Sequence, residues 1–134
     1  MLNDQAVTNW QLRSLAAHID DLLEQQASHP AGAAWVRGEL RVALESSLDL
    51  LADVAAEFGI ETPEARPILA TRDVVAIHLR AAEDVAVAGG RAETVMRMLV
   101  SAATTVNMEL AAVAAARSTL RVVDECGGQA GSRR

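Results

Sequence analysis

The stretch from Arg91 to Glu125 constrains the fold more than any other part of the chain, because its 35 residues include no proline and no glycine. As one helix it would be about 52 Å long, at 1.5 Å per residue. Apolar or small side chains occupy nearly every face of such a helix, and a helix of this kind needs covering on all sides. We therefore expect it to be the innermost helix of the fold. The alternative is a break near Thr104-Thr105, after which two shorter helices would fold back on each other.

The hydrophobic residues are mostly of helix-forming kinds. They make up 51% of the 134-residue chain, yet there is only one phenylalanine, there are two tryptophans, and there is no tyrosine. Alanine, leucine, glutamate and arginine are frequent, and these residues favour helices over strands. The length is enough for one domain with its own core. The sequence predicts an all-α domain.

Three further helices are predicted before the long one, over residues 8–27, 30–58 and 67–88. Each carries an apolar stripe with the three- and four-residue spacing of an amphipathic helix. Short connections imply antiparallel neighbours, so we expect an antiparallel four-helix bundle with a long C-terminal helix. The bundle would occupy residues 1–126 as a single domain, and the composition of residues 127–134 is typical of a disordered tail.

Local signals mark several of the helix ends. Thr8 followed by Gln11 has the spacing of a capping box, in which each side chain satisfies a backbone N–H group of the first turn. Gly59 is placed to cap the C-terminus of the second predicted helix. Gly89-Gly90 separates the third predicted helix from the long one.

The long helix has more apolar surface than one chain can cover. The first predicted helix has about twenty residues and would be roughly 30 Å long, so it cannot shield the whole length. A second copy of the chain is the simplest cover, and we expect a two-fold homodimer. The contact would use the side of the helix that should be polar but is apolar or small, namely Met108, Ala111, Ala112, Ala115 and Val122.

Glu109 is the carboxylate placed on the apolar seam of this helix, between Val106 and Val113. A buried, unpaired charge costs several kcal/mol, so the side chain must find a partner or take up a proton. A raised pKa would make Glu109 a candidate acid or base. The alternatives are an ion pair with an arginine of another helix or subunit, which would fix the register, and simple exposure.

Three neighbours of Glu109 are candidate ligand-binding residues, and one histidine elsewhere is a further catalytic candidate. Asn107, Thr104 and Thr105 lie within one turn of the helix, just before Glu109, and can either bind a ligand or bond to backbone carbonyls of the preceding turn. His78 lies beside an apolar stripe of the third predicted helix. It is either a weak catalytic candidate or a partly buried histidine with its hydrogen bonds satisfied.

Charge and motifs argue against several classes of function. The formal net charge of −6 and the absence of any run of basic residues argue against nucleic-acid binding. No glutamate has a histidine three residues later, and there is no phosphate-binding loop, so we expect no metal and no cofactor. Charged residues interrupt the apolar stretches, which argues against a transmembrane span. The single cysteine, Cys126, fits a reducing cytoplasm, where we expect the protein to be.

Two functions remain. The first is a non-catalytic, dimeric accessory protein that acts through contacts with other proteins. The second is a small helical-bundle enzyme or binding protein, with a pocket around Glu109, Asn107 and His78 for a small apolar or carboxylated ligand.

The second predicted helix also carries a row of charged residues that can be interpreted in more than one way. Such a row is usually a solvated face, but it can also be a cation site or a docking strip for a basic partner; its members are Arg41, Glu45, Asp49, Asp53 and Glu57.

Overall fold

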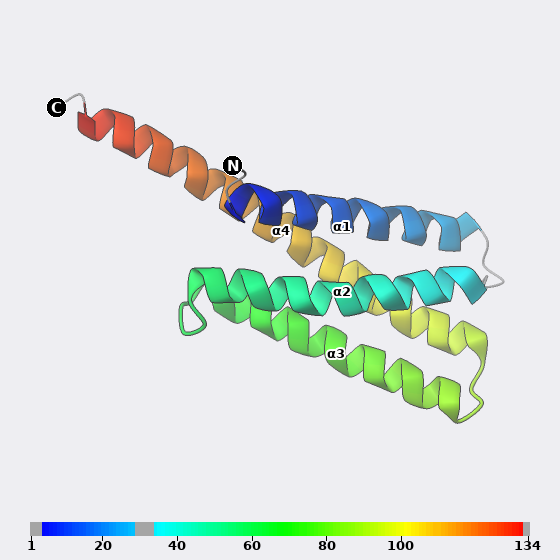
Figure 1. The fold of residues 1–134 in the computed structure, drawn as a ribbon. Coiled ribbons are helices and arrows are strands. Elements are labelled where there is room, and N and C mark those ends of the chain that lie inside the picture. The colour runs from blue at the N-terminus through cyan, green and yellow to red at the C-terminus, as the bar shows by residue number, and fades with distance from the viewer. Residues whose placement is uncertain (1–3, 29–33, 133–134) are drawn as a thin grey trace.

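The described part of the chain folds into four helices. The computed structural model describes residues 4–28 and 34–132, with side chains described over 7–28 and 34–117. Its elements are α1 (Asp4–Ser28), α2 (Ala34–Phe58), α3 (Ala65–Val87) and α4 (Ala92–Ser132), and no strand occurs within the described ranges. The predicted all-α class and the predicted number of helices are confirmed for these ranges, and Figure 1 shows how the helices are arranged.

The helices pack as a bundle. Each helix contacts the next one along the chain, and α4 also contacts α1 and α2. Of the possible pairs, only α1 and α3 make no contact within the described residues. Figure 1 shows α1, α2 and α3 side by side, with α4 crossing them on one side. Both α2 and α4 therefore touch all the other helices.

The core is built from aliphatic side chains with helical spacing. On α2, Leu40, Leu44 and Leu51 are fully buried, as the amphipathic pattern predicts. Full burial of one leucine side chain contributes about 1.5–3 kcal/mol relative to exposure. The partners of these leucines come from every other helix, and the largest are Leu12, Ile19, Leu22, Ile68, Val75, Val106 and Leu110.

Two of the three signals for helix ends, at Thr8 and at Gly59, had different outcomes. Gly59 caps α2 as predicted: its φ is +100°, and its N–H donates to the carbonyl of Ala55 at 3.0 Å. The capping box at Thr8 is wrong. Helix α1 begins at Asp4, so Thr8 lies inside it, where the buried hydroxyl donates to Glu57 Oε1 at 3.2 Å. The hydroxyl that was expected to cap the helix therefore bonds to a residue of α2 instead.

Helix α4 is continuous from Ala92 to Ser132, so the alternative of a break near Thr104-Thr105 is wrong. Both threonines donate to carbonyls of the preceding turn, to Val100 at 2.9 Å and to Ser101 at 3.0 Å. Their hydroxyls are thereby satisfied without interrupting the helix.

Helix α4 is also much longer than its neighbours. With 41 residues it is about 61 Å long, whereas 25 residues give about 38 Å. Figure 1 shows its C-terminal part running past the end of the other helices. The single domain over 1–126 and the disordered tail over 127–134 stay predictions.

Candidate functional site

A buried polar cluster joins three helices near one end of the bundle. The side chain of Arg117 on α4 is only 8% exposed. Its Nε donates to Asn9 Oδ1 on α1 at 2.7 Å, and its Nη1 pairs with Glu57 Oε2 at the end of α2. The other carboxylate oxygen of Glu57 accepts from Thr8. This cluster ties α1, α2 and α4 together.

The sequence pattern does not predict this cluster. Arg117 is one of the charged residues that interrupt the apolar stretches, and Glu57 is the last residue of the charged row on the second predicted helix. The available signal was that Arg117 lies four residues after Val113 on the same seam. An arginine at a seam position needs a carboxylate, but the sequence does not say which of the eighteen acidic residues supplies it.

Glu109 lines a cavity of about 330 Å³ between the end of α2, the start of α3 and α4. Burial raises the pKa of its carboxyl above the ordinary value of 4.5. No ion pair of Glu109 occurs among the described side chains. The other lining residues are mostly apolar, and they are Phe58, Glu64, Pro67, Ile68, Ala112, Val113 and Ala116.

Asn107 lies on another side of α4. Its Nδ2 donates to Asp20 Oδ1 on α1 at 2.6 Å, and its own Oδ1 is buried with no partner among the described residues. Two residues along a helix correspond to a rotation of about 200°. Asn107 and Glu109 therefore face different neighbours, α1 for Asn107 and the α2–α3 end for Glu109.

The remaining predicted site residues do not join Glu109 either. Nδ1 of His78 lies 2.8 Å from the carbonyl oxygen of Val74 in its own helix, and His78 is not among the residues that line the cavity. Thr104 and Thr105 bond to their own helix, as described above. Of the candidate catalytic and ligand-binding residues named from the sequence, only Glu109 lines this cavity.

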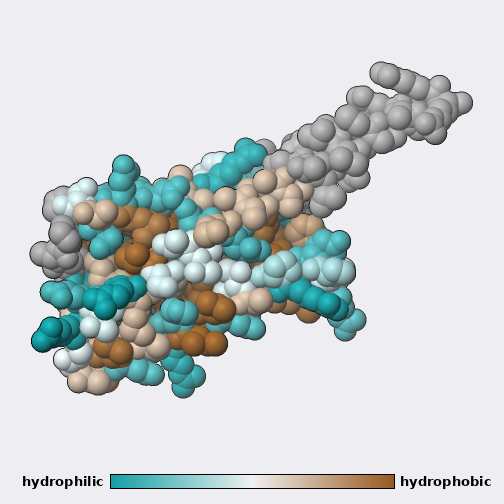
Figure 2. All heavy atoms as spheres, turned by 180° about the vertical axis from the view of Figure 1, so that it is seen from behind, coloured by the Kyte–Doolittle hydropathy of each residue, from teal (hydrophilic) through white to brown (hydrophobic). Residues whose placement is uncertain are grey.

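Four of the predicted interface residues lie together on the outside of α4. We call them the α4 face: Met108, Ala111, Ala112 and Ala115, all of which are exposed. Met108 has 71% of its surface exposed. The side chain of Val122 lies outside the described residues. Figure 2 shows the surface from behind, where pale residues of intermediate hydropathy lie between strongly hydrophobic and strongly hydrophilic ones.

Hollows flank the α4 face on both sides. The one toward α1 measures about 440 Å³ and is lined by Ala111 and Ala115 among others. The one toward α3 is the cavity at Glu109, to which Ala112 contributes. The face is therefore a low ridge between two depressions.

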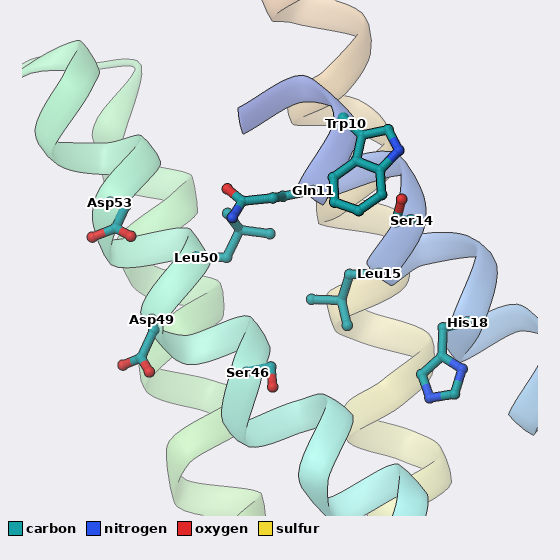
Figure 3. A pocket seen from close by; sticks show the side chains of 9 residues that line it. All are labelled: Trp10, Gln11, Ser14, Leu15, His18, Ser46, Asp49, Leu50 and Asp53. Carbon is teal, nitrogen blue, oxygen red and sulfur yellow. The ribbon is translucent and has the colours of Figure 1, made fainter. Parts of the chain in front are cut away.

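A third depression, the α1–α2 groove, measures about 420 Å³ (Figure 3). Trp10, with 68% of its surface exposed, stands on the α1 side, and Asp49 and Asp53 stand on the α2 side. The other lining residues are Gln11, Ser14, Leu15, His18, Ser46 and Leu50. No group of three or more potential metal ligands occurs among the described residues.

The segment Ala92–Arg117 of α4 is long and apolar enough to cross a membrane by length and composition alone. The core helix of a bundle meets the same criteria, and this segment packs against three other helices. Comparisons of the chain with protein-family models, with curated proteins and with solved structures find no match.

Proposed function

We propose that this protein is a non-catalytic helical accessory protein of the cytoplasm, which acts through protein–protein contacts and forms a two-fold homodimer through the α4 face. The observation that carries the proposal is an uncharged, apolar face on a strongly acidic chain. Its four residues carry no charge, whereas the chain as a whole has a formal charge of −6. Exposed apolar surface of this kind is typical of interaction sites.

The shape of the α4 face favours a second copy as its occupant. Three alanines let another helix approach closely, because their side chains end at Cβ. In a two-fold contact each surface meets its own copy, so a projecting residue needs a depression on the same face. Met108 projects, and the hollows toward α1 and α3 lie beside it.

Within each protomer we propose an antiparallel bundle. The contacts between α1 and α4 support it, because Asp20 meets Asn107 while Asn9 meets Arg117, so residue numbers fall on α1 as they rise on α4. The contacts between α2 and α3 have the same sense: Leu48 meets Arg72, and Arg41 meets Glu83.

Ala111→Glu tests the dimer. Residue 111 is exposed in the protomer, so the charge is compatible with folding, but a two-fold contact would bring two such charges close together. We expect the wild-type chain to sediment at micromolar concentration with twice its mass of 14.2 kDa, and the variant to dimerise at least about tenfold more weakly.

Ala76→Glu is the matched control, since it makes the same change at an exposed position on α3. This variant should dimerise like the wild type, and circular dichroism should show both variants folded. A wild-type chain that sediments as a 14.2 kDa monomer throughout the micromolar range would contradict the proposal.

The second candidate is a small-molecule site at Glu109. It is favoured by the apolar cavity and by the burial that raises the pKa of the Glu109 carboxyl, because an apolar cavity with one polar anchor is typical of sites for small apolar or carboxylated ligands. Asn107 and His78 are not part of this version of the site. Ala112 belongs both to the α4 face and to the lining of the cavity, so a dimer through the α4 face would lie next to the cavity.

A further inference from the structure

The α1–α2 groove combines an apolar floor with an acidic wall. Leu15 and Leu50 lie between the two helices in Figure 3, and Leu50 is 8% exposed. Asp49 and Asp53 lie one turn apart on α2 and are both exposed. None of these residues belongs to the α4 face, so a dimer through α4 does not use them.

The charges of the two aspartates are not neutralised by an ion pair with any described side chain. Arg72 of α3 lies close by, but its Nε donates to the backbone carbonyl of Leu48 at 3.3 Å. No ion pair or hydrogen bond of Asp49 or Asp53 occurs among the described side chains, although Arg41 on the same helix pairs with Glu45 and Glu83. Like charges one turn apart on a helix repel each other by a few tenths of a kcal/mol. A cation bound between them would relieve this repulsion, and the negative net charge of the chain would attract a basic partner from a distance.

Trp10 supplies a second kind of attraction for a cation. Its indole stands on the α1 side of the groove with 68% of its surface exposed. A guanidinium or ammonium group over an indole face gains about 0.5–1 kcal/mol at an exposed site. The other titratable group of the groove is His18, whose Nε2 lies 3.9 Å from Glu39 Oε2.

We propose that the α1–α2 groove binds a basic amphipathic helix of a partner protein. An apolar side chain of that helix would rest on Leu15 and Leu50, while an arginine or lysine would lie between Trp10 and the aspartates. The α4 face of a second copy is a poor occupant, because it has no charge to complement Asp49 and Asp53. The inference rests on the proposed function as an interaction protein and names the chemistry of the partner.

The test uses a synthetic helical peptide with leucines every three or four residues and arginines beside them. The protein is the full chain carrying Trp35→Phe, so that Trp10 is the only tryptophan and its emission reports on the groove. We expect a saturable change in Trp10 emission when the peptide is added at low salt. A peptide in which glutamates replace the arginines should give none.

Two charge-matched double variants decide whether the groove is the site. Asp49→Asn with Asp53→Asn should weaken peptide binding about tenfold, which corresponds to about 1.4 kcal/mol. Asp73→Asn with Asp84→Asn changes the net charge equally at exposed positions of α3, and it should alter binding by less than about twofold. Equal effects of the two pairs would overturn the proposal, and so would an unchanged Trp10 emission.

Sedimentation of the same samples separates this inference from the proposed function. A chain that dimerises but leaves the peptide unbound overturns the groove proposal alone. A monomeric chain that binds the peptide through Asp49 and Asp53 overturns the dimer alone. If Trp10 becomes shielded from a soluble quencher as the protein concentration rises, without peptide, a second copy fills the groove and the proposal is wrong.

Discussion

Arg117 shows how a single buried charge can fix the geometry of a bundle. Burying a guanidinium costs several kcal/mol unless hydrogen bonds and an opposite charge offset the loss of water. Here Glu57 and Asn9 provide both, from two other helices. The pair joins residues 60 positions apart in the sequence. Helix packing decides which carboxylate pairs with Arg117. No local sequence pattern specifies that packing, so the pairing with Glu57 could not be predicted from the sequence.

Glu57→Ala should therefore be costly, although Glu57 itself is more than one-third exposed. The change removes the carboxylate that pairs with the buried guanidinium of Arg117, and we expect the free energy of unfolding to fall by about 2–4 kcal/mol. Asp53→Ala, one turn earlier on α2, removes an exposed carboxylate and should cost less than about 0.5 kcal/mol. Urea unfolding measures both. Similar losses for the two variants would mean that the pair contributes nothing beyond a surface contact.

The spacing of the sequence puts Glu109 on an apolar seam of the long helix. It does not predict the cavity beside Glu109, because that cavity forms where the end of α2 and the start of α3 meet α4. Burial raises the folded-state pKa of Glu109, so the folded chain binds a proton more tightly than the unfolded chain does. Stability therefore decreases as the pH rises from about 4.5 through the raised pKa, and the loss persists at neutral pH.

Glu109→Gln removes this loss while keeping the size of the side chain. We expect its melting temperature to exceed that of the wild type at pH 7, with the difference shrinking as the pH falls to 4. Glu24→Gln, at an exposed position of α1, serves as the control and should show no such trend. A Glu109→Gln variant that is less stable than the wild type at pH 7 would indicate that the carboxylate has a stabilising partner.

At the scale of elements, hydrophobic periodicity predicted that the four helices exist, but it was less accurate about the residue at which each helix begins. The predicted starts at residues 8 and 67 lie four and two positions inside α1 and α3. Periodicity reports the buried face, whereas the first turn of a helix can form without burying much. Helix α4 is continuous through Thr104 and Thr105, whose hydroxyls bond back to their own turn. In the sequence this bonding was only the alternative to ligand binding.

Two glycines of the α2 region should respond in opposite ways to alanine. Gly38 lies inside the helix with nothing within 4 Å of an added Cβ, so Gly38→Ala should stabilise the fold by about 0.5–1 kcal/mol. Gly59 has a φ of +100°, and an added Cβ would lie 3.1 Å from Thr62 Cγ2. Gly59→Ala should therefore destabilise it by about 1–2 kcal/mol. Thermal unfolding of both variants checks the signs, and a stabilising Gly59→Ala would contradict the assigned cap.

At the scale of the whole molecule, two surfaces of different chemistry lie on different helices. The α4 face is uncharged, and the sequence indicated it, because one long helix carried more apolar surface than its neighbours could cover. The α1–α2 groove could not be predicted in the same way. Asp49 and Asp53 were visible as a row on one helix, but Trp10 joins them only through the packing of α1 against α2.

This difference in chemistry predicts opposite responses to salt. Two chains of charge −6 repel each other at long range, and the screening length falls from about 30 Å at 10 mM salt to about 8 Å at 150 mM. Dimerisation through the α4 face should therefore tighten by about two- to fivefold over this range, because its contact is apolar. Binding of the basic peptide in the groove should weaken about tenfold, because screening removes the attraction to Asp49 and Asp53. Sedimentation and Trp10 emission measure the two equilibria separately. A dimer that weakens with salt would mean that charged pairs, rather than the α4 face, hold the two copies together.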